Sequence, residues 1–252
     1  MSTPDFTAST FLVVAFIAVV AGTLTGLVAW LRLAARTGAL SPRSVRPVLG
    51  ALAAWMVVAG GLSLAGVFHS EAFPPPLMIL LWIAAAGVIA VVAVPRSRRA
   101  IVAAPLWATV LLQCFRLPLE LVMHRAFVES VMPAPMSFDG RNFDIVTGAL
   151  ALALGLWLWS RERAGKEPPR AAVWAYNLVG IGLLVNVIVV AVMCMPGPMQ
   201  RIVTDPPNVW VTYLPFVYLP AVLVPLALWG HLSTFAWLLH DRADRANRGE
   251  AS

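Results

Sequence analysis

Long uncharged apolar runs are the feature that most constrains how this chain can fold. A helix needs about 20 residues to cross the roughly 30 Å hydrocarbon core of a bilayer. Seven runs approach or exceed that length, and the segments between them are too short to form a soluble domain. They cover residues 9–31, 47–68, 75–94, 101–124, 144–160, 171–195 and 209–239. We therefore predict an all-α, polytopic membrane bundle of seven transmembrane helices.

The composition excludes an ordinary soluble domain. Of the 252 residues, 60% are hydrophobic and 12% are charged, whereas about a quarter of the residues in soluble domains are charged. We expect a single transmembrane domain over residues 1–240 and a short cytoplasmic tail over 241–252. The two cysteines fall inside different spans, so their positions predict neither a disulfide nor a metal site.

The basic residues predict the orientation of the bundle. Fourteen of the 18 Lys and Arg lie in the segments that follow the first, third, fifth and seventh spans. These segments carry Arg32, Arg36, Arg43 and Arg46; Arg96, Arg98 and Arg99; Arg161, Arg163, Lys166 and Arg170; and Arg242, Arg245 and Arg248. By the positive-inside rule they face the cytoplasm, so we expect the amino terminus outside and the carboxyl terminus inside. The net charge of +6 then follows from topology and indicates no nucleic-acid partner.

A polar stripe interrupts the fourth span. The stretch QCFRLPLELVMHR places four polar residues on one helix face, because they recur at intervals of three and four. They are Gln113, Arg116, Glu120 and His124. A charged side chain that faces lipid at the bilayer centre costs about 2.5–3.5 kcal/mol. The stripe is therefore predicted to face the bundle interior or a water-filled pocket, and Pro118 is predicted to kink the helix beside it.

The spacing leaves two interpretations of the stripe open. Arg116 and Glu120 are four residues apart and can form an ion pair, which would give them a purely structural role. Alternatively, the cost of burying them is tolerated because a polar cavity opens to the outside and binds a ligand. In that interpretation Arg116 contacts an anionic group of the ligand, and Gln113 belongs to the same cavity.

Further polar residues are predicted at the same outer end of the bundle. The loop after the fourth span has a turn signal at Asp139 and Gly140, and Asp144 is placed to cap the fifth helix. A second polar loop follows the sixth span, and the two loops are either a lid over the cavity or solvated connectors. Asn177, nearer the cytoplasm, is expected to make a helix–helix hydrogen bond. The candidate ligand-binding residues from these regions are Asp139, Arg141, Asn142, Asn186, Arg201, Asp205 and Tyr213.

The seventh span is too long for one straight crossing. No Lys, Arg, Asp or Glu occurs between Pro206 and His240, and Pro215, Pro220 and Pro225 recur every five residues. We predict that this span either tilts and kinks or begins along the outer surface of the membrane.

Three stretches carry a resemblance to a known family. FRLPLELVMH, MSFDGRNFDIVTG and PFVYLPAVLVPLALWGHL together resemble a family of bacterial seven-helix integral membrane proteins with no established activity. The resemblance extends over about residues 45–240 and is most specific in GRNFD, which falls in the outer loop. It implies a shared fold and a place in a bacterial inner membrane, and it transfers no catalytic residues.

The chain lacks the residues that several cofactor-dependent membrane proteins need. A retinal Schiff base requires a lysine in the last helix, and the sole lysine is Lys166 in a cytoplasmic loop. Axial haem ligands at matching depth would have to be His69 and His124, both at outer helix ends. No zinc-hydrolase spacing is present. We therefore predict no cofactor and no metal site.

Two classes of function remain. The preferred hypothesis is a sensor, carrier or accessory subunit whose outward-facing polar pocket binds a small amphipathic or lipid-like ligand. The alternative is a membrane-embedded enzyme, such as an isomerase, a cyclase or a lipid-modifying transferase. In the enzyme, Glu120 or Asp144 would act as general acid or base and His124 as a proton shuttle. Membrane lipid is an expected partner, and the sequence indicates no particular protein partner.

Overall fold

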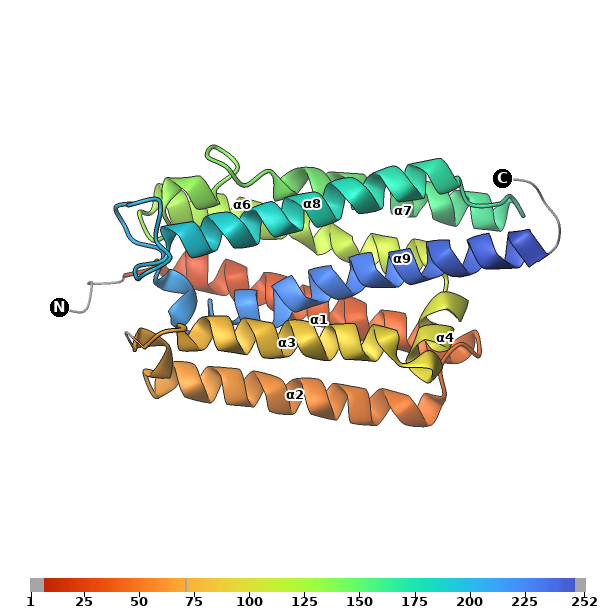
Figure 1. The fold of residues 1–252 in the computed structure, drawn as a ribbon, viewed down its shortest axis with the longest axis horizontal. Helices are drawn as coiled ribbons and strands as arrows, with labels where there is room; N and C mark the ends of the chain where they lie inside the picture. The colour runs from red at the N-terminus through yellow and green to blue at the C-terminus, as the bar shows by residue number, and fades with distance from the viewer. Residues whose placement is uncertain (1–6, 71, 248–252) are drawn as a thin grey trace.

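The protein is a bundle of long helices. A computed structural model describes residues 7–70 and 72–247, and these residues form helices and connecting turns without any strand. The α-helices are α1 (Thr10–Arg36), α2 (Pro42–Leu64), α3 (Pro76–Ala93), α4 (Pro95–Ala103), α5 (Leu106–Leu112), α6 (Arg116–Val128), α7 (Asp144–Arg163), α8 (Arg170–Cys194) and α9 (Val224–Asn247). Short 3-10 turns are η1 (Val67–His69), η2 (Gln113–Phe115), η3 (Ala134–Met136) and η4 (Trp210–Thr212), and η5 (Leu219–Leu223) is a π-helical turn. The start of α1 and the end of α9 lie at opposite ends of the bundle (Figure 1).

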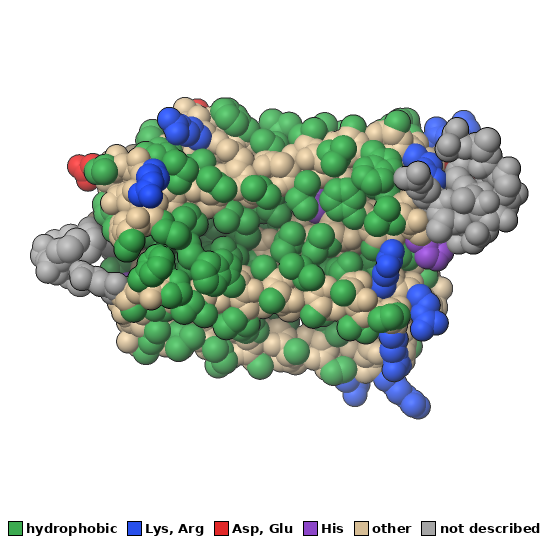
Figure 2. All heavy atoms as spheres, viewed as in Figure 1, with side chains coloured by type: hydrophobic (Ala, Val, Ile, Leu, Met, Phe, Trp, Pro, Cys, Tyr) green, Lys and Arg blue, Asp and Glu red, His purple; other side chains and the backbone are tan. Residues whose placement is uncertain are grey.

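Six helical stretches in the described residues are long and apolar enough to cross a membrane. They are Thr10–Arg36, Pro42–Leu64, Pro76–Ala93, Leu106–Val128, Arg170–Cys194 and Leu219–His240. Hydrophobic side chains cover the visible side of the bundle, and most of the visible Lys and Arg gather toward the end where α4 lies (Figures 1 and 2). The chain is therefore an all-helical protein with the character of a multi-pass membrane protein. α7 is not among the six, and its 20 residues begin at Asp144 and end with Arg161 and Arg163 in the last turn.

Two of the six stretches form the centre of the bundle. In the most apolar 18 residues of Leu106–Val128 and of Leu219–His240, 61% of the residues are buried, against 17–28% in the other four. The central stretches are thus shielded from lipid by their neighbours. Polar side chains on them can be buried against protein, whereas on the outer helices they would face hydrocarbon.

Both central stretches are irregular, and both contain prolines at which the sequence predicted a kink. α5 ends at Leu112, the turn η2 follows, and α6 begins at Arg116. Pro118 thus lies in the first turn of α6, where a missing N–H leaves no helical hydrogen bond unmade. The last helix begins only at Leu219. Residues 209–218 precede this helix, and Trp210 and Phe216 among them are buried against protein.

The last helix extends into the segment that was expected to form the cytoplasmic tail. α9 continues as far as Asn247, so residues 241–247 are helical. Residues 248–252 lie outside the described residues.

α7 begins well inside the bundle. Its first residue, Asp144, is bonded to Arg116 on α6, and Asn142 just before it is bonded to Glu120. Glu120 precedes the last residue of α6, Val128, by eight positions, which is about 12 Å of helix. The loop 129–143 therefore fills the space that two further turns of α7 would occupy.

Asparagine side chains form hydrogen bonds with backbone groups of this loop, as non-helical chain inside a membrane requires. The Asn142 amide donates to the carbonyl of Met136 at 3.0 Å, and the Asn186 amide donates from α8 to the carbonyl of Arg141 at 2.7 Å. The side-chain oxygen of Asn142 accepts from the backbone N–H of Asp144 at 3.1 Å. Asn142 thus caps α7, a role that the sequence had assigned to Asp144.

A second polar contact joins the start of α1 to the end of α6. The Ser9 hydroxyl and backbone N–H donate to the two carboxylate oxygens of Glu129 at 2.7 and 3.1 Å, and Arg125 donates to the same carboxylate at 2.6 Å. Burial alone would raise the pKa of Glu129, but these hydrogen bonds outweigh it and lower the pKa below its usual value. The contact fixes where α1 starts beside the end of α6.

Glycines let α7 approach α5 and α6 closely. A Cβ atom added at Gly148 would lie 2.6 Å from the backbone nitrogen of Leu117, and one added at Gly155 would lie 2.9 Å from the Cβ of Leu111. These contacts hold Asp144, one turn before Gly148, against Arg116.

We expect Gly148→Ala to lower the free energy of unfolding by about 1–3 kcal/mol. In an unhindered helix the change would instead be favourable by about 1 kcal/mol. Here the new methyl group meets the backbone of Leu117, which no rotamer change can relieve. Unfolding by sodium dodecyl sulfate in mild-detergent micelles measures the difference. Gly182→Ala is the matched control, because nothing lies within 4 Å of its added Cβ. Equal effects of the two substitutions would contradict the close packing.

Candidate functional site

Arg116 lies at the centre of a buried polar network. Its side chain is 1% exposed. Nε donates to Oδ2 of Asp144 at 2.6 Å, and Nη1 donates to Nε2 of His231 at 2.8 Å. The expected ion pair between Arg116 and Glu120 is wrong, because the carboxylate paired with Arg116 belongs to Asp144.

The contact with Arg116 fixes the protonation of His231. An arginine side chain can only donate, so Nε2 of His231 must carry a lone pair and accept. The ring proton is then on Nδ1, which donates to Oδ1 of Asn177 at 2.9 Å. The Asn177 amide returns a hydrogen bond to the backbone carbonyl of His231 at 3.2 Å. His231 is therefore a neutral side chain that orients the guanidinium.

Gly180 makes room for this arrangement. A Cβ atom at position 180 would collide with the imidazole of His231. Asn177 lies one turn before it on α8, so the same helix provides the space for the ring and the amide that holds it.

Glu120 is held by the loop before α7. The side-chain nitrogen of Asn142 lies 3.0 and 2.9 Å from the two carboxylate oxygens of Glu120. Both residues are buried, at 1% and 0% exposed. Arg116, Asp144 and Glu120 thus occupy neighbouring positions, with only Arg116 and Asp144 in direct ionic contact.

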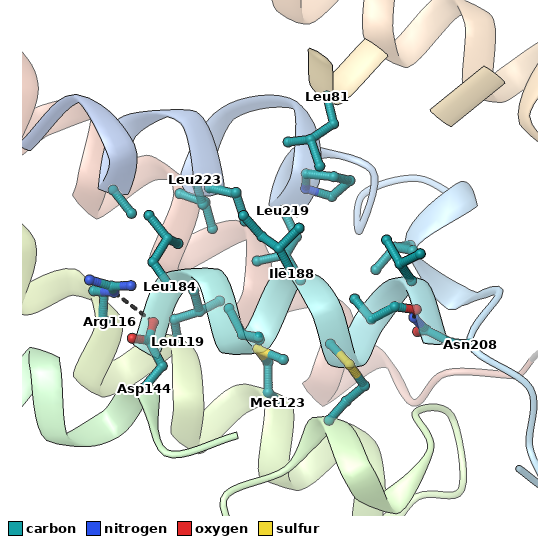
Figure 3. A pocket seen from close by; sticks show the side chains of 18 of the residues that line it. Leu81, Arg116, Leu119, Met123, Asp144, Leu184, Ile188, Asn208, Leu219 and Leu223 are labelled. Atoms are coloured by element: carbon teal, nitrogen blue, oxygen red, sulfur yellow. Dashed lines mark hydrogen bonds and ion pairs between the residues drawn. The ribbon is translucent and has the colours of Figure 1, made fainter. Parts of the chain in front are cut away.

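These three residues line one end of an otherwise apolar cavity. The cavity contains about 860 Å³ of space between its walls, including the part that is open to the outside. Apart from Arg116, Glu120 and Asp144, the sole polar lining residue in the described chain is Asn208. Figure 3 shows Arg116 and Asp144 at one end and Asn208 at the other, with Leu119, Leu184, Ile188, Leu219 and Leu223 between them.

The opening of the cavity lies between α3 and α8. α3 packs against α9 and η5, and α8 packs against α7 and α9, so these two helices approach the same central helix from different sides. Leu77 and Leu81 of α3 face the cavity from one side, and Ile188 and Val192 of α8 line the other. In the space-filling view the surface is hollowed between these helices, toward the end opposite α4 (Figure 2). The cavity is therefore reached from the side of the bundle.

One buried donor in the cavity wall has no partner in the described part of the chain. Nη2 of Arg116 is fully buried and makes no hydrogen bond. The Asn208 side-chain oxygen at the opposite end is likewise unpaired among the described residues. A buried polar atom without a partner costs about 1–3 kcal/mol, so a bound molecule whose polar group reached either atom would remove that cost.

The structure brings together five of the residues that the sequence proposed for the site. Gln113, Arg116, Glu120, Asn142 and Asp144 are all buried and lie around the inner end of the cavity or directly behind it. Gln113 does not line the cavity, and its amide donates to the carbonyl of Leu226 on α9 at 3.4 Å. The inward-facing stripe of the fourth span is confirmed for its first three members.

The remaining proposed residues do not line the cavity. His124 is 32% exposed and contacts Ser137 and Asp139 in the outer loop, away from Glu120. Tyr213 stacks on His69 with 4.4 Å between ring centroids. Asn186 binds the backbone of the loop before α7. The other four proposed residues are exposed in the loops before α7 and after α8, and they are Asp139, Arg141, Arg201 and Asp205.

Sequence reasoning missed His231 as a site residue. A lone histidine in an apolar run is nevertheless a usable signal of a buried polar contact. The expected helix–helix hydrogen bond of Asn177 is confirmed, and its partner is His231. The apolar residues of α3 and α8 that line the cavity could not be identified from the sequence, because they are of the same types as the residues that face lipid.

Among the described residues, no three His, Cys, Asp or Glu side chains lie close enough to hold a metal ion. The site is thus a hydrogen-bonding end wall on an apolar cavity. It can orient a polar group at Arg116 while the rest of a molecule lies against hydrocarbon side chains.

Comparison with known proteins identifies the family. The chain belongs to the family described as a domain of unknown function (DUF8737), whose profile matches residues 74–239. The matched stretch contains every residue of the buried network from Arg116 to His231 and the GRNFD sequence. Searches of curated proteins and of solved structures each found no match.

We expect Asp144→Ala to lower the free energy of unfolding by about 3–5 kcal/mol, because it leaves the Arg116 charge buried and unpaired. The double variant Arg116→Met with Asp144→Leu should recover most of that loss, since it removes both charges and keeps the volume filled. Detergent unfolding measures both. Asp139→Ala, in the exposed loop, is the control and should change stability by less than about 1 kcal/mol. A double variant as unstable as the single one would refute the pairing.

Proposed function

We propose that this member of the DUF8737 family is an integral membrane protein that binds a small amphipathic or lipid-like molecule in the cavity between α3, α6, α8 and α9. It would act as a sensor, carrier or accessory subunit. The observation that carries this proposal is the buried Arg116, whose Nη2 has no partner in the described chain and which lies in the end wall of an apolar cavity.

The chemistry of the lining supports a lipid-like ligand. Most of the wall is Leu, Val, Ile, Met and Ala, which gain from contact with hydrocarbon and offer nothing to a water-soluble molecule. The polar groups are confined to the two ends. A molecule with an apolar body and a polar terminus therefore matches the cavity better than a polar metabolite.

The side opening supports entry from the membrane. A lipid that diffuses in the bilayer reaches the space between α3 and α8 without leaving hydrocarbon. The outer loops need not move for this route, because the exposed residues Asp139, Arg141, Arg201 and Asp205 do not line the cavity.

We also propose a topology. α7 would be a seventh crossing, shortened on the outside by the loop 129–143. The basic residues between α1 and α2, in α4 and between α7 and α8 would face the cytoplasm. This arrangement puts the amino terminus outside and the carboxyl terminus inside. The membrane would be a bacterial inner membrane, as the sequence resemblance implies.

An acid–base enzyme is the second candidate, and one observation favours it. Two carboxyl groups, those of Glu120 and Asp144, line the cavity. Asp144 is already paired with Arg116, which leaves Glu120 as the proposed acid or base. His124 does not contact Glu120, so a shuttle through it receives no support from the geometry. Glu120→Gln should abolish turnover in an enzyme but leave a bound ligand in place.

We expect a bound species of defined mass in protein extracted from its own membrane, and we expect Ala191→Phe to remove it. Ala191 lines the cavity from α8, so the phenyl ring occupies the ligand space without touching Arg116. Native mass spectrometry of the extracted protein measures the occupancy. Val189→Phe, at an exposed position on the same helix, is the matched control and should retain the ligand.

Two outcomes count against the cavity as the binding site. The first is the same bound species in both phenylalanine variants. The second is only heterogeneous bulk lipid in the wild type, which would leave Arg116 and Asp144 with a structural role alone.

The seventh crossing predicts that the two ends of α7 lie on opposite sides of the membrane. In a background with Cys114→Ala and Cys194→Ala, a membrane-impermeant maleimide added to intact cells should label Asp139→Cys and not Lys166→Cys. Both positions are exposed. Opening the cells should make Lys166→Cys reactive. Labelling of both from the same side would exclude α7 as a crossing.

A further inference from the structure

We infer that the polar group bound at Arg116 is uncharged and accepts hydrogen bonds, as the carbonyl or hydroxyl oxygen of a membrane acyl or isoprenoid lipid does. This inference rests on the proposed function and specifies the ligand class for the same cavity. It reverses the expectation from the sequence, in which Arg116 contacted an anionic group.

The charge at the inner end of the cavity is already balanced. Arg116 is the sole basic residue in the described lining, and its partner Asp144 is 2.6 Å away. His231 adds no positive charge, because its Nε2 must be unprotonated to accept from Arg116. Glu120 contributes either no charge or one negative charge. The sum over Arg116, Asp144 and Glu120 is therefore zero or −1 in every protonation state of Glu120.

An anionic headgroup would find no free positive charge at this end. The headgroup would lose its hydration, and the only cation it could contact there is Arg116, whose charge Asp144 already neutralises. A second negative group would also lie close to the carboxylate of Asp144, and to that of Glu120 when Glu120 is ionised. Burial of an anion there is unfavourable, whereas a neutral oxygen pays none of this electrostatic penalty.

The unpaired N–H group of Arg116 indicates that the ligand group accepts a hydrogen bond. Nη2 of Arg116 is buried in the described structure without an acceptor. A guanidinium has no lone pair to offer, so the ligand must supply the acceptor. A carbonyl or hydroxyl oxygen meets both requirements, since it carries a lone pair and no charge.

The length of the apolar wall supports a chain behind that group. The α8 side of the lining runs from Leu184 to Met195, which is about 16 Å of helix. Between the polar inner end and Asn208 the lining is apolar throughout. An alkyl or isoprenoid chain of moderate length can lie along it with its polar end at Arg116.

Three probes with the same chain test the head-group chemistry. Methyl dodecanoate carries an acceptor without a charge, dodecanol carries a hydroxyl, and dodecanoate at about pH 9 carries a carboxylate. Each is added at equal mole fraction to purified wild-type protein in lipid nanodiscs, and occupancy is measured by native mass spectrometry. We expect the ester and the alcohol to bind at least about tenfold more tightly than the carboxylate. Ala191→Phe should abolish all specific occupancy.

The two neutral probes distinguish the source of the oxygen. Equal binding of the ester and the alcohol indicates that an acceptor alone suffices, as for a carbonyl-bearing lipid. Stronger binding of the alcohol indicates that its hydroxyl proton also donates to a carboxylate, for which Oδ1 of Asp144, buried without a donor among the described residues, is unoccupied. The ligand is then a lipid alcohol. Either result supports an uncharged acceptor.

The variant Asp144→Asn should reverse the preference between the charged and the uncharged probe. It leaves the Arg116 charge without a carboxylate partner, so dodecanoate should now bind more tightly than the ester and raise the thermal unfolding temperature. In the wild type dodecanoate should give no such stabilisation. If Asp144→Asn does not fold, the comparison of the three probes on the wild type decides alone.

Failure of the inference and failure of the proposed function give different results. Wild-type protein that prefers dodecanoate, with occupancy lost in Ala191→Phe, overturns the uncharged head group and retains the lipid-binding cavity. Wild-type protein that binds none of the three, or binds them equally in Ala191→Phe, overturns the cavity as a binding site and the inference with it.

Discussion

The rest of the structure is arranged around the buried guanidinium of Arg116. A charge in the interior of a membrane bundle is stable only where other groups compensate it, because lipid offers no hydrogen bonds. Asp144 from α7 supplies the opposite charge, and His231 from α9 supplies an oriented acceptor. Asn177 from α8 sets the tautomer of that acceptor, and Gly180 leaves room for its ring. Four helices therefore contribute to the environment of one side chain, which makes the network a constraint on how the central helices pack.

The position of Asp144 has a second consequence, because it starts α7 beside the first turn of α6. The outer part of the bundle is then filled by the loop 129–143 in place of a helix. Asn142 makes three contacts that hold this loop. Its oxygen accepts from the first N–H of α7, and its nitrogen donates to the carbonyl of Met136 and to the carboxylate of Glu120. The same arrangement places the buried Arg116, Glu120 and Asp144 in the wall of a cavity that α3, α8 and η5 also line. The features that compensate the charge thus also create the polar end of the cavity.

The sequence predicted the helices well because uncharged length is a direct physical requirement of a membrane crossing. The run 75–94, for example, became α3 over Pro76–Ala93. It also predicted that Gln113, Arg116 and Glu120 face inward. It could not predict the partner of Arg116, because helical spacing favours Glu120 whereas tertiary packing brings in Asp144 from 28 residues away. The sequence also left open whether the two polar loops cover the cavity or are solvated connectors. Asp139 and Arg141 lie close to the buried Asn142 in sequence, yet the turn directs them to the exposed surface.

The most direct test is an experimental structure of the wild-type protein in nanodiscs made from its native lipids, at a resolution that separates side chains from ligand. The account predicts elongated density between α3 and α8 that is continuous from Asn208 to Arg116. Its polar end should lie within hydrogen-bonding distance, about 2.7–3.2 Å, of Nη2 of Arg116. A cavity closed by the protein's own side chains, with Nη2 of Arg116 bonded to Glu120, would contradict the account and leave the network a purely structural one.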